Sequence, residues 1–176
     1  MRVWHYTVFS NAVGIINDRE ILPTGMLAQH IDIPGVWLSS NPVWEETVWK
    51  VLRDIDTGEM TPELPKDVLF EWGIIPVRIE IDPTDVPVYS WEDHKRITAM
   101  PKECSESWEK TGREKGGSPK EWYVIYQGIP STIWFDPIEI WTGTEWDDIA
   151  TLFTKDKRRS NHHLLDKTVR RKPPSQ

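Results

Sequence analysis

The chain has 176 residues, a formal net charge of −7 and 38% hydrophobic residues, and it contains 11 tryptophans. This length is enough for one domain with a sizeable core. The tryptophans offset a modest apolar content, and they favour either a core of large rings or a cleft that stacks a flat ligand. An acidic body argues against a broad nucleic-acid-binding surface, because such a surface requires a basic face.

Basic residues are concentrated near the end of the chain. Residues 155–172 contain eight basic and two acidic side chains, a net charge of +6, so the rest of the chain carries −13. We therefore predict one domain over residues 1–153 and a basic tail over residues 154–176. Such a tail is typical of a solvated, flexible end, and it is also a candidate contact for an acidic partner or a nucleic acid.

Cysteine usage and hydropathy indicate the compartment. The single Cys104 excludes an internal disulfide and is typical of a reducing environment. No apolar run approaches the length of a membrane span, and no charged-then-apolar leader opens the chain. We expect a cytoplasmic protein without a membrane partner.

The first elements in chain order are a strand and a helix. Residues 2–7 are aromatic and β-branched, which predicts a strand. Ser10 or Asn11 is suited to cap a helix that runs to about Asn17. Residues 21–25 then read as a short extended piece that ends in a turn.

A second strand and helix are expected after a loop. Val36–Ser39 predicts a buried strand, and Asn41 a helix cap with Pro42 in the first turn. A mainly apolar stripe with helical spacing then predicts a helix; its residues are Val43, Trp44, Thr47, Val48, Val51 and Leu52. A loop is expected over residues 54–67.

The middle of the chain carries the clearest strand pattern. Ile74–Ile81 alternates apolar and polar side chains, with its odd-numbered residues on one face. Residues 88–91 read as a short strand. Residues 102–115 are polar and predict a helix, and a Gly-rich turn follows.

Two further strands are expected near the end of the domain. Glu121–Gln127 and residues 132–141 read as strands, joined by a turn at residues 128–130. We expect these two strands to pair as a hairpin. Helices come early, strands dominate later and regular βαβ alternation is missing, so the predicted fold is α+β with a mainly antiparallel sheet.

Three segments place polar side chains at predicted strand ends within apolar runs: residues 4–7, 36–40 and 121–126. Alternation along the first strand puts His5 and Thr7 on one face. A lone histidine there is commonly a core residue with one backbone hydrogen bond, but the three segments together favour a shared site. The chain has no Gly-rich phosphate loop, zinc-ligand spacing or nucleophile elbow, so we expect no metal site.

The order of these three segments resembles the ADP-ribosyltransferase superfamily, whose members place a His or Arg, a Tyr or Ser and a Glu on three separate strands. The likeness covers residues 2–141. It includes an ILPTG piece after the first helix, the segment GVWLSSNPVWE and the segment SPKEWYVIYQGIPSTIW. The resemblance implies split, mainly antiparallel sheets around an NAD cleft. It also implies cleavage of the nicotinamide–ribose bond and transfer of ADP-ribose to a macromolecular acceptor, a protein rather than a nucleic acid, as in a bacterial or phage effector toxin.

By the same resemblance, each segment has an expected role. His5 would bind the adenine-side ribose, and the backbone around Tyr6 and Thr7 would hold the nicotinamide amide. Ser39 or Ser40 would support the ribose and the carboxylate. The catalytic residue would be Glu121, bound to the nicotinamide ribose, and Trp44 would pack either on the nicotinamide ring or in the core.

Several alternatives stay open. Ser39 and Ser40 point to opposite faces, and Ser40 is favoured. The competing carboxylates are Glu45, Glu46, Glu71 and Glu80; Glu71 is the main rival, whereas Glu45 and Glu46 read as solvated helix residues. Pro119 stands where arginine-modifying members carry Gln or Glu, so arginine is disfavoured as the acceptor, and Arg96 is a candidate phosphate contact. Other readings are an RNA 2′-phosphotransferase-like enzyme and a non-catalytic binding or inhibitor protein on the same fold.

Overall fold

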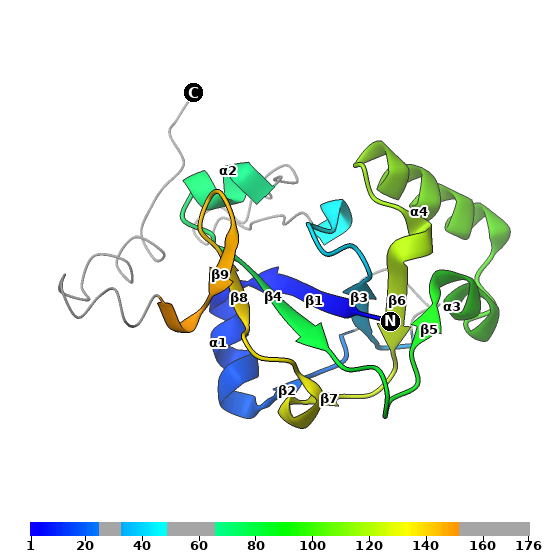
Figure 1. The fold of residues 1–176 in the computed structure, drawn as a ribbon. Coiled ribbons are helices and arrows are strands. Elements are labelled where there is room, and N and C mark those ends of the chain that lie inside the picture. Colours follow the sequence, from blue (N-terminus) through cyan, green and yellow to red (C-terminus); the bar gives the residue numbers. More distant parts are fainter. Residues whose placement is uncertain (25–32, 49–65, 152–176) are drawn as a thin grey trace, which may run out of the picture.

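The computed structural model describes residues 1–24, 33–48 and 66–151. One seven-stranded sheet, in the order β5-β6-β3-β1-β4-β8-β9, forms the centre of the molecule, and a two-stranded sheet joins β2 to β7 (Figure 1). The strands are β1 (Val3–Val8), β2 (Glu20–Ile21), β3 (Val36–Ser39), β4 (Pro76–Ile81), β5 (Tyr89–Ser90), β6 (Trp122–Ile125), β7 (Ile129–Pro130), β8 (Glu139–Trp141) and β9 (Trp146–Asp148).

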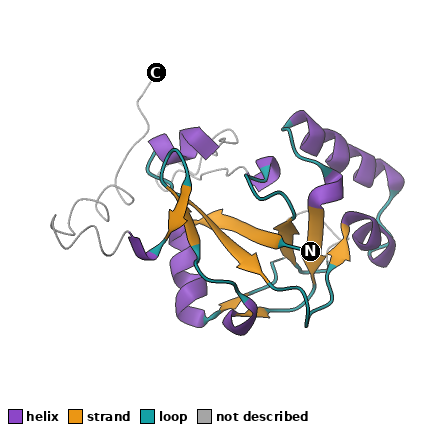
Figure 2. Ribbon diagram, viewed as in Figure 1, coloured by secondary structure: helices purple, strands orange, loops and turns teal. Residues whose placement is uncertain are grey.

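Helices lie near both ends of this sheet (Figure 2). The α-helices are α1 (Phe9–Asp18), α2 (Lys66–Glu71), α3 (Trp91–Ile97) and α4 (Lys102–Glu114), and the short 3-10 helices are η1 (Glu46–Val48), η2 (Pro119–Glu121) and η3 (Ser131–Ile133). Every strand pairing is antiparallel among the described residues. The prediction of an α+β fold with a mainly antiparallel sheet is therefore confirmed.

The central strand β1 pairs with β4 over six residues, from Val3 opposite Ile81 to Val8 opposite Pro76. The alternation predicted for β4 is confirmed, because Val77, Ile79 and Ile81 are fully buried. These side chains belong to two adjoining apolar clusters: Ile79 and Ile81 pack with Val3, whereas Val77 packs with Ala12 of α1. The strand is thus buried on one face by its own alternation.

The first helix begins earlier than expected. Helix α1 starts at Phe9, directly after β1, and its N-cap residue Val8 makes no side-chain capping bond. The prediction of Ser10 or Asn11 as the cap is therefore wrong. At the other end, Arg19 adopts the left-handed conformation (φ 55°), and its N–H bonds to the carbonyls of Ile15 and Ile16, which satisfies carbonyls at the helix end.

The helix predicted from Asn41 to Leu52 is not formed over its described part. Residues 42–45 have no regular secondary structure, and a single 3-10 turn follows at Glu46–Val48. Asn41 still accepts hydrogen bonds from the amides of Val43 and Trp44 (3.0 and 3.4 Å), so it closes a turn in place of capping a helix. Residues 49–65, which include the rest of this helix and most of the predicted loop, lie outside the described residues. The end of that loop is helical, in α2.

The hairpin predicted near the end of the domain is also wrong. Strand β6 pairs with β3 and β5, whereas β8 pairs with β4 and β9 on the other side of β1. Residues 128–130 are not a simple turn, because Ile129 and Pro130 pair with β2. Of residues 132–141, predicted as one strand, only Glu139–Trp141 is a strand. Local alternation does not show which neighbour a strand will join.

Two further observations concern the described residues as a whole. None of their helices has both the length and the apolar character needed to cross a membrane. No group of three or more His, Cys, Asp or Glu side chains among them is arranged to hold a metal ion. The predicted boundary at residue 153 and the basic tail lie outside the described part of the chain.

Candidate functional site

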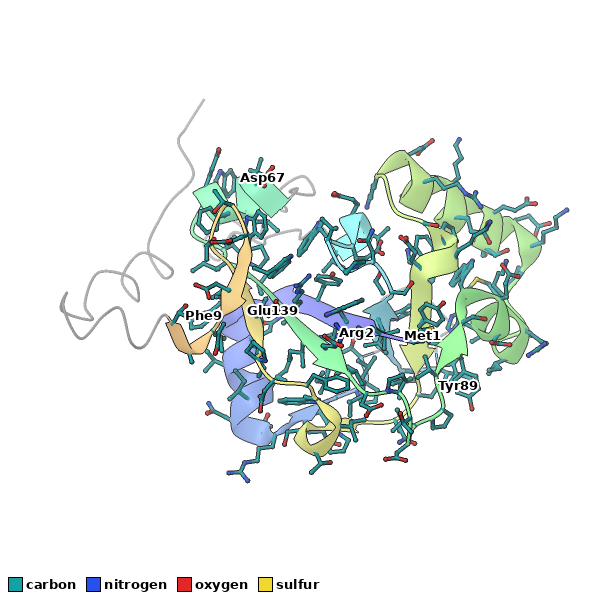
Figure 3. All side chains as sticks on the ribbon, in the orientation of Figure 1. Met1, Arg2, Phe9, Asp67, Tyr89 and Glu139 are labelled. Carbon is teal, nitrogen blue, oxygen red and sulfur yellow. The ribbon has the colours of Figure 1, made fainter. Side chains whose placement is uncertain are left out.

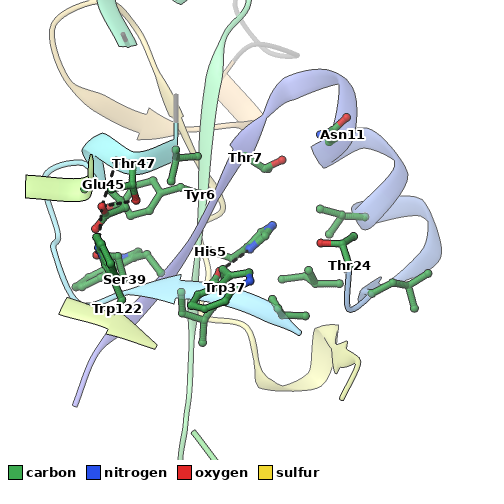
Figure 4. Close-up of a pocket in the computed structure, with 18 of the residues that line it drawn as sticks. His5, Tyr6, Thr7, Asn11, Thr24, Trp37, Ser39, Glu45, Thr47 and Trp122 are labelled. Carbon is green, nitrogen blue, oxygen red and sulfur yellow. Dashed lines mark hydrogen bonds between the residues drawn. The ribbon is translucent and has the colours of Figure 1, made fainter. Parts of the chain in front are cut away.

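A cavity of about 920 Å³ opens where β1 and β3 separate (Figure 4). The register between these two strands contains one residue pair, Trp4 opposite Ser39, whereas β3 stays paired with β6 along four residues. Beyond the Trp4–Ser39 pair, residues of both strands line the cavity, and α1 and β2 border one end while η1 and α4 border the other. The gap in the central sheet therefore creates the site.

Four of the predicted site residues line this cavity: His5, Tyr6, Thr7 and Ser39. The Nδ1–H of His5 donates to the carbonyl of Trp37 across the gap between the strands (3.1 Å). This bond fixes the imidazole against β3 and places the proton of a neutral ring on Nδ1. The segments around residues 5 and 39 thus meet at one cavity.

Of the carboxylates that line this cavity, the one of Glu45 is buried. Its side chain is 4% exposed, and one oxygen accepts the hydroxyl of Ser39 (2.7 Å). The other oxygen accepts from the hydroxyl and the amide of Thr47 (2.6 and 3.2 Å) and from the indole N–H of Trp122 (3.1 Å). The interpretation of Glu45 as a solvated helix residue is wrong, because the side chain is buried and bound by four donors.

Two glycines make room for this carboxylate. A Cβ atom on Gly117 would lie 2.9 Å from Oε1 of Glu45, and one on Gly112 would lie 2.3 Å from the ring of Trp122. Real Cβ atoms essentially never approach so closely. The absence of side chains at both positions therefore allows α4 and the following turn to close over Glu45 and its tryptophan partner.

The irregular segment that carries Glu45 is held by side chains from three strands. The carbonyls of Asn41, Pro42 and Val43 each accept a hydrogen bond. The donors are the hydroxyl of Tyr6 (2.5 Å), the guanidinium of Arg78 and the indole of Trp146 (2.8 Å). Arg78 also pairs with Glu139 of β8, which is labelled in Figure 3 (2.6 Å). These bonds satisfy backbone groups that lack secondary-structure partners, and so they position Glu45 without a helix.

Tyr6 and Trp44 form part of an aromatic cluster. Their rings meet edge to face with centroids 5.2 Å apart, and they pack with Trp4. Burial raises the pKa of the Tyr6 hydroxyl above its ordinary value, so the group stays protonated and donates to Asn41. Trp44 is 3% exposed and lies outside the cavity lining; of its two expected roles, the structure places it in the core.

The remaining predicted residues lie beside the cavity, outside its lining. Glu121 ends the turn η2, and the side-chain amide of Asn41 donates to its carboxylate (3.3 Å). Ser40 donates its amide to the carbonyl of Glu121 (2.9 Å). The structure therefore joins Glu121 to Ser40 and Asn41 and brings Ser39, not Ser40, to the cavity.

The other candidate carboxylates do not line the cavity either. Glu71 is exposed at the end of α2, Glu46 is half-buried in η1, and Glu80 pairs with Arg2 (3.2 Å). Arg96, considered as a phosphate contact, pairs with Asp93 (2.6 Å), and its side chain is 79% exposed. Glu45 is thus the one carboxylate among those considered that the structure brings to the site.

Sequence reasoning missed the aromatic wall of the cavity. Trp37, Trp91, Trp108 and Trp122 all contribute to the lining, from β3, α3, α4 and β6. The tryptophan content indicated a core of rings or a stacking cleft; all four of these side chains line the cavity, and Trp91 and Trp122 are also buried in the core. No sequence signal separated them from the purely internal tryptophans, because the difference depends on which helix covers which strand.

Comparison of the chain with protein-family models, with curated proteins and with solved structures found no match.

Proposed function

We propose that the protein is an NAD-dependent ADP-ribosyltransferase that uses the cavity between β1 and β3, with Glu45 as its carboxylate. The observation that carries the proposal is the buried Glu45, bound by Ser39, Thr47 and Trp122 at the cavity edge. The placement of His5 and the β3 serines on two separate strands, which resembles this superfamily, supports it, although Glu45 follows β3 and does not lie on a third strand. The carboxylate differs from the one that the resemblance implied.

The charge balance at Glu45 favours a role in chemistry over one in packing. Burying a carboxylate costs free energy, and proteins usually offset it with a cation. Among the described residues, Glu45 forms no ion pair with lysine, arginine or histidine, and all its donors are neutral groups. Its negative charge is therefore held in place but not cancelled, which suits an electrostatic role toward a developing cation.

Nicotinamide–ribose cleavage creates such a cation. The C1′–N bond breaks, its electron pair leaves with the neutral nicotinamide, and the ribose becomes oxocarbenium-like, as in glycoside cleavage. A nucleophile of the acceptor then bonds to C1′ and loses its proton to solvent. Glu45 stabilises the positive charge during this exchange, and Ser39 and Thr47 orient the carboxylate by their hydrogen bonds.

The size and charge of the cavity are compatible with a dinucleotide. Its volume of about 920 Å³ falls near the top of the usual range for cofactor sites, about 300–1,000 Å³. Among the described lining residues, Lys115 is the one lysine or arginine, whereas Asp18, Glu20 and Glu45 are acidic. A site built mainly for several RNA phosphates would need more cations, so the phosphotransferase alternative is less well supported.

The test incubates the protein with a cell lysate and with NAD that carries a label on its adenylate half. Two quantities are measured together: the free nicotinamide released and the label transferred to macromolecules of the lysate. We expect Glu45→Gln to lower both by at least about 100-fold, the scale of losing one preorganised electrostatic group. Glu46→Gln, altered at the adjacent half-buried carboxylate, serves as the matched control and should keep its activity. Glu121→Gln should also keep it.

Folding is checked in parallel by thermal melting, because the amide of Glu45→Gln changes the hydrogen bonds of a buried group. Glu45→Asp provides a second variant that keeps the charge, and it should retain more activity than Glu45→Gln. Wild-type protein that releases no nicotinamide and binds no NAD would contradict the proposal and favour a non-catalytic binding protein. Full activity in a folded Glu45→Gln variant would contradict the role of Glu45.

A further inference from the structure

One face of α4 belongs to the cavity. Trp108, Thr111, Gly112 and Lys115, the residue that caps the helix, all contribute to the lining. Their spacing of three, four and seven residues places them on one side of a helix. Gly112 packs against the ring of Trp122, so this side of α4 presents a ring, a hydroxyl and an ammonium to the same space.

The ring of Trp108 ends a series of stacked aromatic side chains. Tyr126, His94, Trp91 and Trp108 follow one another with centroids 5.9, 5.5 and 5.9 Å apart and planes within 23°, 19° and 20° of parallel. His94 and Trp91 are buried, whereas Trp108 is half-buried and lines the cavity. Among the described residues, Trp91 is the one ring that Trp108 stacks on.

The charged side chains differ between the two ends of the cavity. The end bordered by α1 and β2 includes Asp18 and Glu20, whereas the end bordered by η1 and α4 includes both Lys115 and the buried Glu45. A phosphate is repelled by the first pair and attracted by the lysine. The cation and the terminal ring of the stacked series therefore lie on the same helix face.

From this arrangement we infer that the α4 face is a nucleotide subsite, in which a flat nitrogen ring stacks on Trp108 and its phosphate contacts Lys115. Seven residues of helix span about 10 Å, which a nucleotide and a lysine side chain together can bridge. Thr111 lies between the two positions and offers a hydroxyl to the intervening sugar. The inference rests on the proposed function, since it names the part of the cavity where one half of NAD binds.

The experiment measures the affinity of the full chain for AMP, nicotinamide mononucleotide and adenosine by calorimetry. AMP and nicotinamide mononucleotide share the ring and the phosphate, and they distinguish which half of NAD the subsite takes. We expect Trp108→Leu to weaken binding of the preferred mononucleotide by about 5-fold to 100-fold, the range for a base that loses its aromatic partner. Trp108→Phe should restore much of this loss.

The lysine is tested by comparing the affinity for a mononucleotide with the affinity for the same compound without its phosphate. The pair is AMP and adenosine, or nicotinamide mononucleotide and nicotinamide riboside if the subsite prefers the nicotinamide half of NAD. We expect the phosphate to strengthen binding to wild type, and Lys115→Gln to abolish most of that difference while Lys115→Arg keeps it. The control is Lys110→Gln, on the same helix with a side chain 77% exposed and outside the cavity lining. It should bind as the wild type does.

The inference is overturned if wild type binds neither mononucleotide, if a folded Trp108→Leu variant binds as tightly as wild type, or if Lys115→Gln leaves the phosphate preference unchanged. Its failure is distinct from failure of the proposed function. NAD turnover that depends on Glu45 but not on Trp108 or Lys115 would overturn the inference alone. Mononucleotide binding that depends on both residues without NAD turnover would overturn only the enzymatic proposal.

Discussion

Gly14 and Gly112 both lie within helices, yet their surroundings differ. A Cβ atom added at Gly14 of α1 would meet nothing within 4 Å. One added at Gly112 of α4 would meet the ring of Trp122 at 2.3 and 2.4 Å. The first glycine thus carries only the entropic cost of its flexible backbone, whereas the second permits a helix and a strand residue to approach.

We expect Gly112→Ala to lower the free energy of unfolding by about 1–3 kcal/mol, because the added methyl group forces Trp122 from its place. Gly14→Ala should raise it by about 0.5–1 kcal/mol, since alanine favours the helix and restricts the unfolded chain. Urea denaturation of the two variants and the wild type measures both changes. Equal effects of the same sign would contradict the structural difference.

At the scale of elements, Glu109 connects α4 to α3. One of its oxygens accepts from the indole of Trp91 and the ammonium of Lys95 (both 2.8 Å), and the other accepts from Arg113 (2.6 Å). Its side chain is 15% exposed. The hydrogen bonds from Lys95 and Trp91 lower the pKa of Glu109 from 4.5 to about 2, because they favour the charged form.

This pKa shift makes the packing of α3 on α4 sensitive to acid. A carboxyl whose pKa is lowered by folding stabilises the folded state above its unfolded pKa, and this contribution is lost as the pH falls through the folded pKa. The advantage of wild type over Glu109→Gln should therefore be complete above pH 4.5 and shrink between pH 4.5 and about 2. Urea denaturation at several pH values measures this difference.

Glu106→Gln is the matched control for that experiment. Glu106 lies on the same helix, its side chain is 63% exposed, and it faces Lys102 at 3.6 Å. An exposed pair of this kind contributes little to stability. If Glu109→Gln and Glu106→Gln give the same pH profile, the connection between the two helices is not what stabilises the wild type.

At the scale of the whole molecule, the cavity lies at the middle of the sheet. Strands β4, β8 and β9 follow β1 on one side, and β3, β6 and β5 lie on the other. Between β1 and β3 the register is a single pair, so a ligand that fills the gap contacts both halves of the sheet. Binding there should stabilise the folded state as a whole.

We expect NAD at about 100 times its dissociation constant to stabilise the protein by about 2.7 kcal/mol. For a chain of this length, that corresponds to a rise of about 5–10 °C in melting temperature. Differential scanning fluorimetry over a range of NAD concentrations measures the rise, with adenine alone as the control ligand. An unchanged melting temperature at millimolar NAD would contradict a dinucleotide site in this cavity.

Local patterns in the sequence were sufficient for several elements. The alternation of residues 74–81 predicted a strand, and Val77, Ile79 and Ile81 proved to share its buried face. Strand β3 has the bounds that its apolar run predicted, and α4 covers nearly the predicted range. These features depend on side-chain period alone, which a single segment contains.

What the sequence by itself determined was thus the strands β1, β3, β4, β5 and β6, the helices α1 and α4, and the approach of the segments around His5 and Ser39 to one place. Only the tertiary structure decided that Glu45, and not Glu121, places a buried carboxylate at the cavity. Its position depends on partners far along the chain, namely Trp122, Gly112 and Gly117. No local pattern contains such contacts, because they form only when α4 and β6 close over the irregular segment that follows β3.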